Sequence, residues 1–313
     1  MKKNKKIVLI CLLILTLLSI VRYINREDYW IVDIFSQFPV QYALCALLLL
    51  VVCLWKKTTS LALFAAFLFV FNISVLSDFG NFAQAAGEKD KTFKVYSANI
   101  NKFNNDYKKL VGGLIKTDAD VLLLLEVTER NIKPLQVLIE RYPYRVVNLN
   151  IESSGTGIVL MSKFAILHHN ITVYSDFGNM MVAAILEIMD KKLAFYATHF
   201  PRPEFIPVFS DRSMQFISLA RQINGQSLPV IVAGDLNATP YSPIFRSFLN
   251  VSGLKDSREG FGWQPSWPAY FPLLWLPIDH ILVSPEIQVH NRSTGPYIGS
   301  DHFPVFAELS MGH

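Results

Sequence analysis

The residues most able to do chemistry in this sequence follow short apolar runs. The clearest case is the run at residues 230–233, which is followed by Gly234, Asp235 and Asn237. A continuous apolar run predicts a strand buried on both faces, and side chains two positions apart leave an extended strand on the same side. We therefore expect Asp235 and Asn237 to project together from the end of a buried strand. Taken alone, the same pair is also typical of an Asx turn before a helix.

Polar residues occupy the same kind of position elsewhere in the chain. Nearly every other buried strand that we predict begins or ends at a residue able to bind a metal or a phosphate group. These residues are Asn99, Glu126, His199, Asp279, His280, Ser300, Asp301 and His302. Each has a structural explanation by itself, as a turn residue, a helix N-terminal charge or a surface side chain. Their repetition at strand ends favours one shared site.

The chemistry of this set indicates a magnesium site, because it is rich in oxygen and free of sulfur. Mg²⁺ prefers oxygen ligands, keeps several waters and usually needs only one or two carboxylates plus substrate phosphate. Glu126 with Asn99 meets that requirement. Zinc sites more often show closely spaced histidines, and His-x-x-x-His does not occur in this sequence. We expect Mg²⁺ as the cofactor, with Mn²⁺ as the alternative.

The elements that must position these residues are short strands and amphipathic helices. Continuous or alternating apolar patterns predict the strands, and apolar residues at helical spacing predict the helices. Strands are expected at residues 93–98, 121–125, 144–149, 157–161, 166–173, 181–189, 193–197, 230–233, 278–283 and 303–309. Helices are expected at residues 106–115, 132–142, 209–223 and 242–250. Helices at both ends of this region, with a strand meander between them, predict two mixed sheets packed together with helices outside.

The N-terminal part of the chain has the pattern of a membrane anchor. Apolar, nearly uncharged runs at residues 7–21, 38–55 and 61–76 each approach the roughly 20 residues that cross a bilayer. Lysines cluster before the first run and, as Lys56 and Lys57, between the second and third. The positive-inside rule predicts that both clusters face the cytoplasm. Three crossings then leave everything after the third run on the outer side.

This topology divides the chain into three parts. They are a multi-pass anchor of about three helices in the cytoplasmic membrane at residues 1–77, a linker at residues 78–91, and a periplasmic or extracellular domain at residues 92–313. A cleaved signal peptide is the alternative, because the lysine-rich start suits one. However, no small-x-small cleavage site follows closely after Val21, and Ala83-Gln84-Ala85, which has that form, lies far too late in the chain.

Charge and cysteine content constrain the function of the outer domain. Residues 1–87 hold 8 Lys and Arg against 4 Asp and Glu, whereas the rest of the chain holds 21 of each kind. A neutral domain lacks the basic surface that sequence-independent DNA binding generally requires, which counts against a nuclease. Cys11, Cys45 and Cys53 all fall in the apolar runs. Thiol catalysis, cysteine-ligated zinc and disulfides are therefore excluded for the outer domain.

The ordered motifs resemble the endonuclease/exonuclease/phosphatase superfamily, the metal-dependent phosphoesterases related to DNase I. The matching pieces follow the family's order and span roughly residues 92–310. They are Ser97-Ala98-Asn99-Ile100, Leu125-Glu126-Val127, Ala197-Thr198-His199-Phe200, Gly234-Asp235-Leu236-Asn237, Ile278-Asp279-His280-Ile281 and Ser300-Asp301-His302. The resemblance implies an α/β (α+β) fold, a four-layer sandwich of two mixed β-sheets flanked by helices, preceded here by an N-terminal transmembrane helical segment. It also implies a metal-dependent phosphoric ester hydrolase.

The resemblance implies a metal site built on Glu126 as the principal Mg²⁺ ligand. Asn99 lies beside it, and Asp301 contributes directly or through water. Such a cation matters because hydrolysis of a phosphate ester requires an oxygen nucleophile to attack an anion. A cation and preorganised hydrogen-bond donors therefore supply most of the acceleration.

The resemblance also implies a role for each of the other matching residues. Asp235 is implied to orient or deprotonate the attacking water, and Asn237 and His199 to bind the phosphoryl oxygens. His302 is implied to face the phosphorus, either as a base or as a transition-state stabiliser. Asp279 is implied to hold His302 in a carboxylate–histidine pair.

Residues 261–277 are the segment that bears most on the substrate. They hold six aromatic residues and four prolines and lie between two of the motifs, so we expect them to rim the active site, with Trp267 as a candidate substrate contact. Aromatic side chains of this kind favour the lipid headgroup region, and they also stack on bases. The alternative is that these rings cover a sheet edge as core. Arg202, close to His199, is the candidate clamp for a phosphate or an anionic headgroup.

Zero net charge and a membrane tether favour a lipid or lipid-linked phosphodiester or monoester as the substrate. An extracytoplasmic endonuclease or exonuclease, with nucleic acid as substrate, is the alternative. A catalytically silent membrane-anchored binding protein is a third hypothesis, which loss of Glu126, Asp235 or His302 would indicate; all three are present. No obligate protein partner is predicted.

Overall fold

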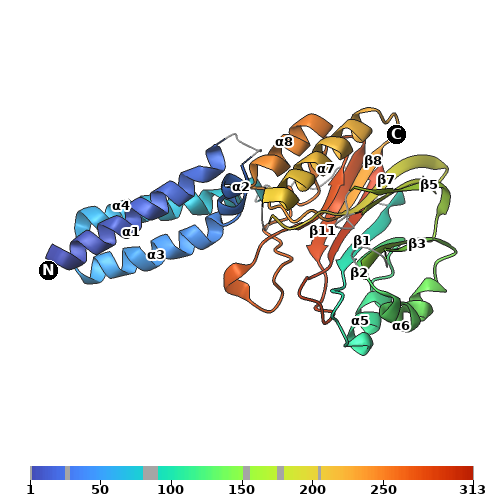
Figure 1. Ribbon diagram of the computed structural model, residues 1–313, viewed down its shortest axis with the longest axis horizontal. Coiled ribbons are helices and arrows are strands. Elements are labelled where there is room, and N and C mark those ends of the chain that lie inside the picture. Colours follow the sequence, from blue (N-terminus) through green and yellow to red (C-terminus); the bar gives the residue numbers. More distant parts are fainter. Residues whose placement is uncertain are drawn as a thin grey trace.

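The computed structural model describes residues 2–24, 29–79, 91–150, 156–174, 180–203 and 206–312. A bundle of long helices projects from one side of a domain built on two β-sheets (Figure 1). The bundle consists of α1 (Lys2–Ile20), α3 (Pro39–Trp55) and α4 (Thr59–Ile73). A short helix, α2 (Trp30–Ser36), lies where the bundle meets the domain. Residues 80–90 of the predicted linker lie outside the described residues.

Two of these helical segments, Lys5–Tyr23 and Thr59–Ser77, are long and apolar enough to cross a membrane. Helices α2 and α3 pass the same test only as a pair, which is bent by 60° at the break between them. The break falls before Pro39, the first residue of α3, because the residue preceding a proline disfavours the helical conformation. The described residues therefore contain two candidate spans, or three if the bent pair counts as one.

The domain that follows the helical bundle contains two six-stranded mixed sheets. The first has the strand order β11-β12-β1-β2-β4-β3, and the second has the order β5-β6-β7-β8-β10-β9. The bounds in the first sheet are β1 (Phe93–Asn99), β2 (Val121–Val127), β3 (Tyr144–Asn150), β4 (Thr156–Ser162), β11 (Ile287–Thr294) and β12 (Val305–Met311). Those in the second are β5 (Ala165–Val173), β6 (Met180–Ile188), β7 (Lys191–His199), β8 (Val230–Asp235), β9 (Lys255–Asp256) and β10 (Asp279–Val283).

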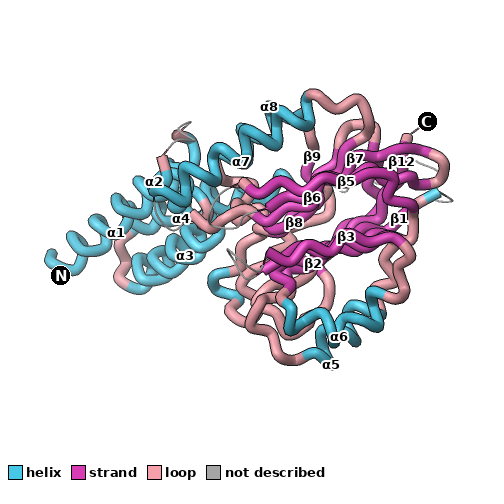
Figure 2. Tube along the Cα trace, turned by 45° about the vertical axis from the view of Figure 1, so that its right-hand side comes forward, coloured by secondary structure: helices cyan, strands magenta, loops and turns pink. Residues whose placement is uncertain are grey.

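The two sheets pack face to face, and helices cover each outer face (Figure 2). Helices α5 (Tyr107–Ile115) and α6 (Glu129–Ile139) lie on the first sheet. Helices α7 (Ile206–Asn224) and α8 (Pro243–Ser252) lie on the second. This arrangement confirms the two packed mixed sheets that the sequence pattern predicted and the four-layer sandwich that the family resemblance implied.

Strands buried on both faces account for the continuous apolar runs in the sequence. In β2, Leu123 faces the other sheet, whereas Leu122 packs toward α5 and α6. In β8, Ile231 faces the other sheet, whereas Val232 packs toward α7 and α8. Because side chains alternate along a strand, successive positions of β2 and β8 must be apolar to fill both cores.

Strand β11 was not predicted from the sequence. It lies at the edge of the first sheet beside β12, and a bulge interrupts their pairing between Val289 and Asn291. An edge strand has one face and one side open to solvent, so it carries polar residues and shows no continuous apolar run. The register shift also breaks the alternation that would have indicated a strand.

Candidate active site

Strand register brings the predicted site residues to one edge of the sandwich. The parallel pair β7 and β8 places His199 opposite Asp235, and the antiparallel pair β10 and β8 places Asp279 opposite the same Asp235. In the other sheet, the parallel pair β1 and β2 places Asn99 beside Leu125, one residue before Glu126. The ends of central strands from both sheets therefore meet at a single site.

Glu126 is turned into this site by a backbone irregularity. The register between β2 and β4 shifts between Leu125 and Val127, and Glu126 itself has φ of 57°. A β-bulge of this kind re-aims one side chain out of the alternating pattern. A positive φ at a residue other than glycine is uncommon and persists only where the surrounding structure holds it.

The end of β8 and the turn after it are fixed by close packing against β7 and by the hydrogen bonds of Asn237. At Gly234 an added Cβ would lie 1.8 Å from the carbonyl oxygen of Thr198, so β7 and β8 leave no room for a side chain there. Asn237 has φ of 49°, and its backbone N–H donates to Oδ1 of Asp235 at 2.9 Å. Its side-chain amide donates to the carbonyl of Phe200 at 2.8 Å. The Asx-turn and active-site interpretations of this pair are therefore compatible.

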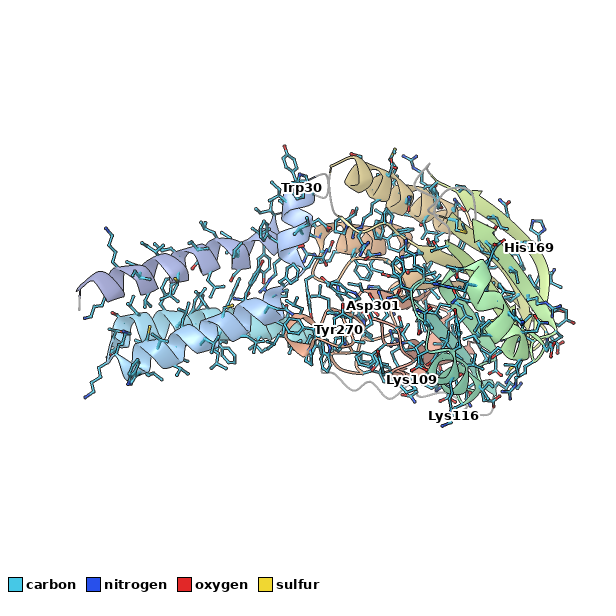
Figure 3. All side chains as sticks on the ribbon, turned by 60° about the horizontal axis from the view of Figure 1, so that its bottom comes forward. Trp30, Lys109, Lys116, His169, Tyr270 and Asp301 are labelled. Carbon is cyan, nitrogen blue, oxygen red and sulfur yellow. The ribbon has the colours of Figure 1, made fainter. Side chains whose placement is uncertain are left out.

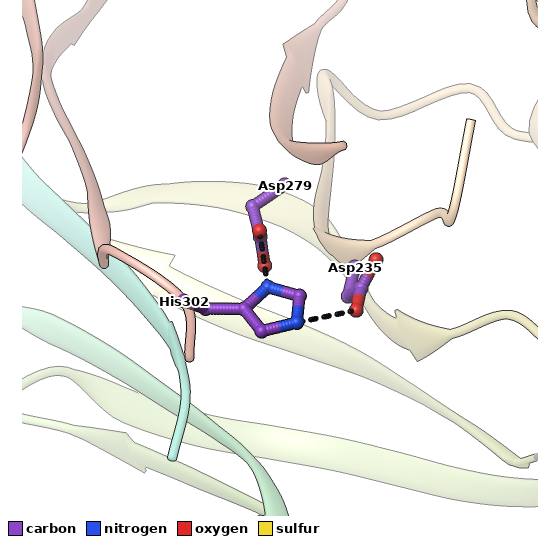
Figure 4. Close-up of side chains that lie close together, drawn as sticks. All are labelled: Asp235, Asp279 and His302. Atoms are coloured by element: carbon purple, nitrogen blue, oxygen red, sulfur yellow. Dashed lines mark hydrogen bonds and ion pairs between the residues drawn. The ribbon is translucent and has the colours of Figure 1, made fainter. Parts of the chain in front are cut away.

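Asp279, His302 and Asp235 form a buried row (Figure 4). Nδ1 of His302 lies 2.7 Å from Oδ2 of Asp279, and Nε2 lies 3.7 Å from Oδ2 of Asp235. Burial opposes the charged form of His302, but Asp279 and Asp235 raise its pKa to about 10. Burial, together with the charge of Asp279, raises the pKa of Asp235 to about 6. At neutral pH this row therefore holds an imidazolium between two carboxylates.

A second group of contacts surrounds Glu126. Its Oε1 accepts from Nδ2 of Asn99 at 3.0 Å, and its Oε2 accepts from the backbone N–H of Lys102 at 3.1 Å. Nε2 of His199 lies 3.8 Å from Glu126 and 3.6 Å from Asp235, so it bridges the two groups. Burial raises the pKa of Glu126, but His199 and the hydrogen bonds from Asn99 and Lys102 outweigh it and hold this pKa below its usual value.

These side chains open into a cavity of about 460 Å³. Glu126, His199, Asp235, Asn237, Asp301 and His302 all line it. Asn99 and Asp279 do not line the cavity and instead hold Glu126 and His302 from behind. The structure thus brings together the residues that the sequence motifs indicated, and it separates those facing the cavity from those supporting them.

The predicted substrate-contact residues also line this cavity. Arg202 is an exposed lining residue, and Trp267 is a half-buried one. The indole of Trp267 donates to Oδ2 of Asp301 at 3.2 Å. Segment 261–277 therefore contributes to the rim of the site, and Trp267 helps to hold Asp301. Figure 3 shows Asp301 on the side of the domain nearer the helical bundle.

Among the lining residues that the sequence motifs did not indicate, two hold carboxylates of the site in place. Asn101 donates to Oδ1 of Asp301 at 2.7 Å, and Lys102 supplies the N–H that holds Glu126. Its spacing could have indicated Asn101, because this residue follows Asn99 by two positions at the end of a strand. His280, in contrast, does not line the cavity. Its Nε2 lies 2.8 Å from the carbonyl oxygen of Ala238, and its Nδ1 lies 3.3 Å from Nη2 of Arg258.

The residues present fit a hard divalent cation. Glu126, Asp235, Asp279 and Asp301 place four carboxylates in or behind the cavity, an excess of negative charge that the His302 imidazolium only partly offsets. Among the described residues, Asp235, Asp279 and His302 have ligand atoms within 4.8 Å of one another. An imidazolium has no lone pair to offer a metal, so this trio is better suited to proton chemistry. Glu126, exposed to the cavity and fixed by two donors, is the better-placed metal ligand.

A four-layer sandwich with a metal-compatible carboxylate cluster fits the class of metal-dependent phosphoesterases. The model of the endonuclease/exonuclease/phosphatase family matches residues 96–302, which is more than half of the chain. This chain belongs to that family and is a hydrolase of phosphate esters. A search of curated proteins finds no significant match.

Solved structures share the fold at low sequence identity. A humanized D. rerio TDP2 matches with a TM-score of 0.59 at 17% identity, covering 71% of this chain and 100% of that one. The human Nocturnin catalytic domain matches with a TM-score of 0.60 at 17% identity, covering 71% and 95%. A mannosyl-6-phosphatase from Bacteroides thetaiotaomicron matches with a TM-score of 0.57 at 18% identity, covering 70% and 100%. These likenesses concern the fold alone.

Proposed function

We propose that this protein is a Mg²⁺-dependent phosphoesterase that works outside the cytoplasmic membrane on a lipid or lipid-linked phosphate. The observation that carries the proposal is the composition of the cavity wall. Ile34 and Phe38, at the base of the helical bundle, line the same cavity as Glu126 and His302. A substrate with an apolar portion can therefore lie on the wall nearest the anchor while its phosphate reaches the polar wall.

The arrangement of the bundle supports membrane anchorage with the domain on the outer side. The N-terminus and the turn between α3 and α4 lie at the end of the bundle far from the domain (Figure 1). The lysines predicted to face the cytoplasm belong to these two segments. Helix α3 has 17 residues, which at 1.5 Å each give about 26 Å, close to the ~30 Å hydrocarbon core. In this proposal α1, α3 and α4 cross the membrane and α2 lies outside it.

An exposed apolar tip of the outer domain supports contact with the membrane surface. Tyr270 is 71% exposed and Leu273 is 62% exposed, and Phe271 and Leu274 are exposed beside them. Tyr270 lies beside the end of the helical bundle (Figure 3). Nε2 of Gln41, in α3, donates to the carbonyl of Trp275 at 3.1 Å, so this tip is held against the anchor. Aromatic and apolar side chains exposed at this level favour the interfacial region of a bilayer.

The site residues divide the work of hydrolysis. When bound, Mg²⁺ would be held by Glu126, with Asp301 and the amide of Asn99 nearby, and would neutralise charge on the phosphate. Asp235, whose pKa of about 6 leaves it ionised at neutral pH, accepts a proton from the attacking water. Protonated His302 donates from Nε2 to a phosphoryl oxygen as negative charge develops.

The remaining polar residues bind or position the phosphate in this proposal. His199 and Asn237 line the cavity and hydrogen-bond to the phosphoryl oxygens. Arg202 and Lys102, which line the same cavity, attract the anionic substrate. Because an arginine presents several donors in a fixed plane, Arg202 is the better suited of the two to hold a phosphate or a charged headgroup.

An extracytoplasmic nuclease remains the second candidate. One observation favours it: one of the structures with this fold is D. rerio TDP2 in complex with a single-stranded DNA product. The neutral charge of the outer domain argues against extended contact with nucleic acid, since such binding depends on several neutralised phosphates.

One assay of the full-length protein in detergent or nanodiscs separates these candidates. Its substrates are phospholipids, sphingomyelin, phosphoinositides, single-stranded DNA and supercoiled plasmid, each with Mg²⁺ and then with EDTA. We expect Mg²⁺-dependent turnover of a lipid and slow or no cleavage of nucleic acid. Rapid Mg²⁺-dependent nicking of plasmid without lipid turnover would overturn the lipid proposal.

The topology has its own test. A reporter enzyme that is active only outside the cytoplasm, fused after Gly87, is expected to be active. The same reporter fused after Lys57 serves as the control and is expected to be inactive. The opposite pattern would reverse the proposed orientation.

A further inference from the structure

Helix α2 presents two buried polar side chains to the outer domain. Asp33 is 1% exposed and Gln37, just after the helix, is 5% exposed. A carboxylate removed from water is costly unless it is paired and hydrogen-bonded, so its partners matter. Neither residue belongs to the family's motifs, and both come from the part of the chain that precedes the outer domain.

The hydrogen bonds of these two residues lead to the segment that follows Asp235, either directly or through Arg212. Oδ2 of Asp33 lies 2.8 Å from Nη1 of Arg212, a fully buried residue of α7. Nη2 of the same arginine donates to the backbone carbonyl of Asn237 at 2.9 Å. Arg212 therefore connects α2 directly to a residue that lines the active-site cavity.

Two further bonds reach the same segment without an intermediary. Oε1 of Gln37 accepts from the backbone N–H of Thr239 at 2.7 Å. Oδ1 of Asp33 accepts from the hydroxyl of Ser242, the residue that precedes α8. Nε2 of Gln37 also donates to Oδ2 of Asp33 at 3.3 Å, so Gln37 and Asp33 are hydrogen-bonded to each other. Residues 237–242 are thus held at their start, middle and end.

This segment needs such restraint for a conformational reason. Asn237 adopts a positive φ, and its N–H holds the carboxylate of Asp235 in place. A residue in that region of conformational space keeps its geometry only when its surroundings over-determine it. The restraints named above come from α2 and from the arginine that α2 holds.

We propose that α2 is a component of the active site and that Asp33, acting through Arg212, is a positioning residue for Asn237 and Asp235. The proposal rests on the proposed function, since Asp235 and Asn237 must act on the phosphate for their placement to matter. It makes the N-terminal helical part necessary for turnover itself, even of a small soluble ester that makes no use of a membrane.

A different result is expected if α2 serves only to attach the helical bundle to the domain. If α2 only tethered the domain, any contact between the two parts would be equivalent. Gln41 provides the comparison, because its bond to the carbonyl of Trp275 joins the parts without touching residues 237–242. Gln41→Ala is therefore the matched control for Asp33→Asn.

The test uses the full chain in nanodiscs with bis(p-nitrophenyl) phosphate and Mg²⁺. Asp33→Asn is expected to lower kcat about 10- to 100-fold, because small displacements of reacting groups have effects of this size, while KM changes less than about twofold. Hydrogen exchange should become faster at residues 237–242. Gln41→Ala should leave both measurements unchanged.

A second variant guards against misfolding of the first. Ser242→Ala removes only one hydroxyl from the network, and it should give a smaller fall in kcat with faster exchange confined to the same segment. Unchanged kcat and exchange in both Asp33→Asn and Ser242→Ala would overturn the proposal, as would equal effects of Gln41→Ala. If the parent protein hydrolyses no phosphate ester but Asp33→Asn still speeds exchange at residues 237–242, the proposed function fails and the positioning by Asp33 stands.

Discussion

His302 and Asp279 are joined by a buried hydrogen bond of 2.7 Å between Nδ1 and Oδ2. This bond fixes the ring so that Nε2 faces Asp235 at 3.7 Å. Because the neighbouring carboxylates raise the pKa of His302 to about 10 and the pKa of Asp235 is about 6, the histidine is protonated and Asp235 is ionised at neutral pH. The sequence left open whether His302 acts as a base or as a stabiliser of the transition state. These charges favour the second role.

The pH dependence of activity should reflect both groups. Turnover should fall below about pH 6 as Asp235 becomes protonated, and it should fall again near pH 10 as His302 loses its proton. The measurement is kcat/KM for a soluble phosphodiester between pH 4.5 and 10.5 at saturating Mg²⁺, which reports the free enzyme. Activity that rises through pH 6.5 to a plateau with no alkaline decline would contradict this assignment and favour a histidine base.

Removing the carboxylate behind His302 should impair catalysis more than folding. Asp279→Asn is expected to lower kcat roughly 10²- to 10⁴-fold, the usual range for loss of an oriented acid–base group. The alkaline limb of the pH profile should also move to lower pH, because burial lowers the pKa of His302 and only the charges of Asp235 and Asp301 then remain to oppose it. Asp118→Asn is the matched control, since Asp118 is an exposed carboxylate paired with Lys163. A shift in the control, or none in Asp279→Asn, would contradict the pairing.

Replacing Asp235 should stabilise the fold while abolishing activity. A carboxyl whose folded-state pKa is raised to about 6 stabilises the fold when protonated, and that stability is lost as pH rises through about 6. At pH 7.5 the ionised Asp235 therefore lowers the free energy of unfolding by about 1 to 3 kcal/mol. Asp235→Asn should raise Tm at pH 7.5, and this gain should shrink at pH 4.5. A lower Tm at pH 7.5 would show that the carboxylate is structurally favourable.

The Mg²⁺ concentration that the enzyme requires should be set by Glu126. EDTA should abolish turnover and Mg²⁺ should restore it, with Mn²⁺ as a test of selectivity. Glu126→Gln should raise the Mg²⁺ concentration for half-maximal activity by about tenfold or more, the scale on which loss of a supporting group weakens a metal site. Glu187→Gln, at an exposed position on β6, is the control for charge alone. An unchanged Mg²⁺ requirement in Glu126→Gln would remove this residue from the metal site.

Particular features of the fold could be predicted because they depend on local patterns. The apolar run before Asp235 indicated a strand buried on both faces, and β8 has both faces buried. Strand β11 was missed because its polar composition and bulge follow from its place at a sheet edge. Asn101 and Lys102 were missed because their importance lies in the atoms they hold, Asp301 and Glu126.

The sequence by itself determined most of the strands and helices, the apolar N-terminal segments and the polar residues at strand ends, since each is a property of neighbouring residues. Only the tertiary structure decided which of these residues meet. Register placed His199 and Asp279 on either side of Asp235, and the bulge turned Glu126 toward them. Asp33 and Arg212, 179 positions apart, show the reason most clearly. Their contact arises from packing between distant elements, which no local pattern of residues encodes.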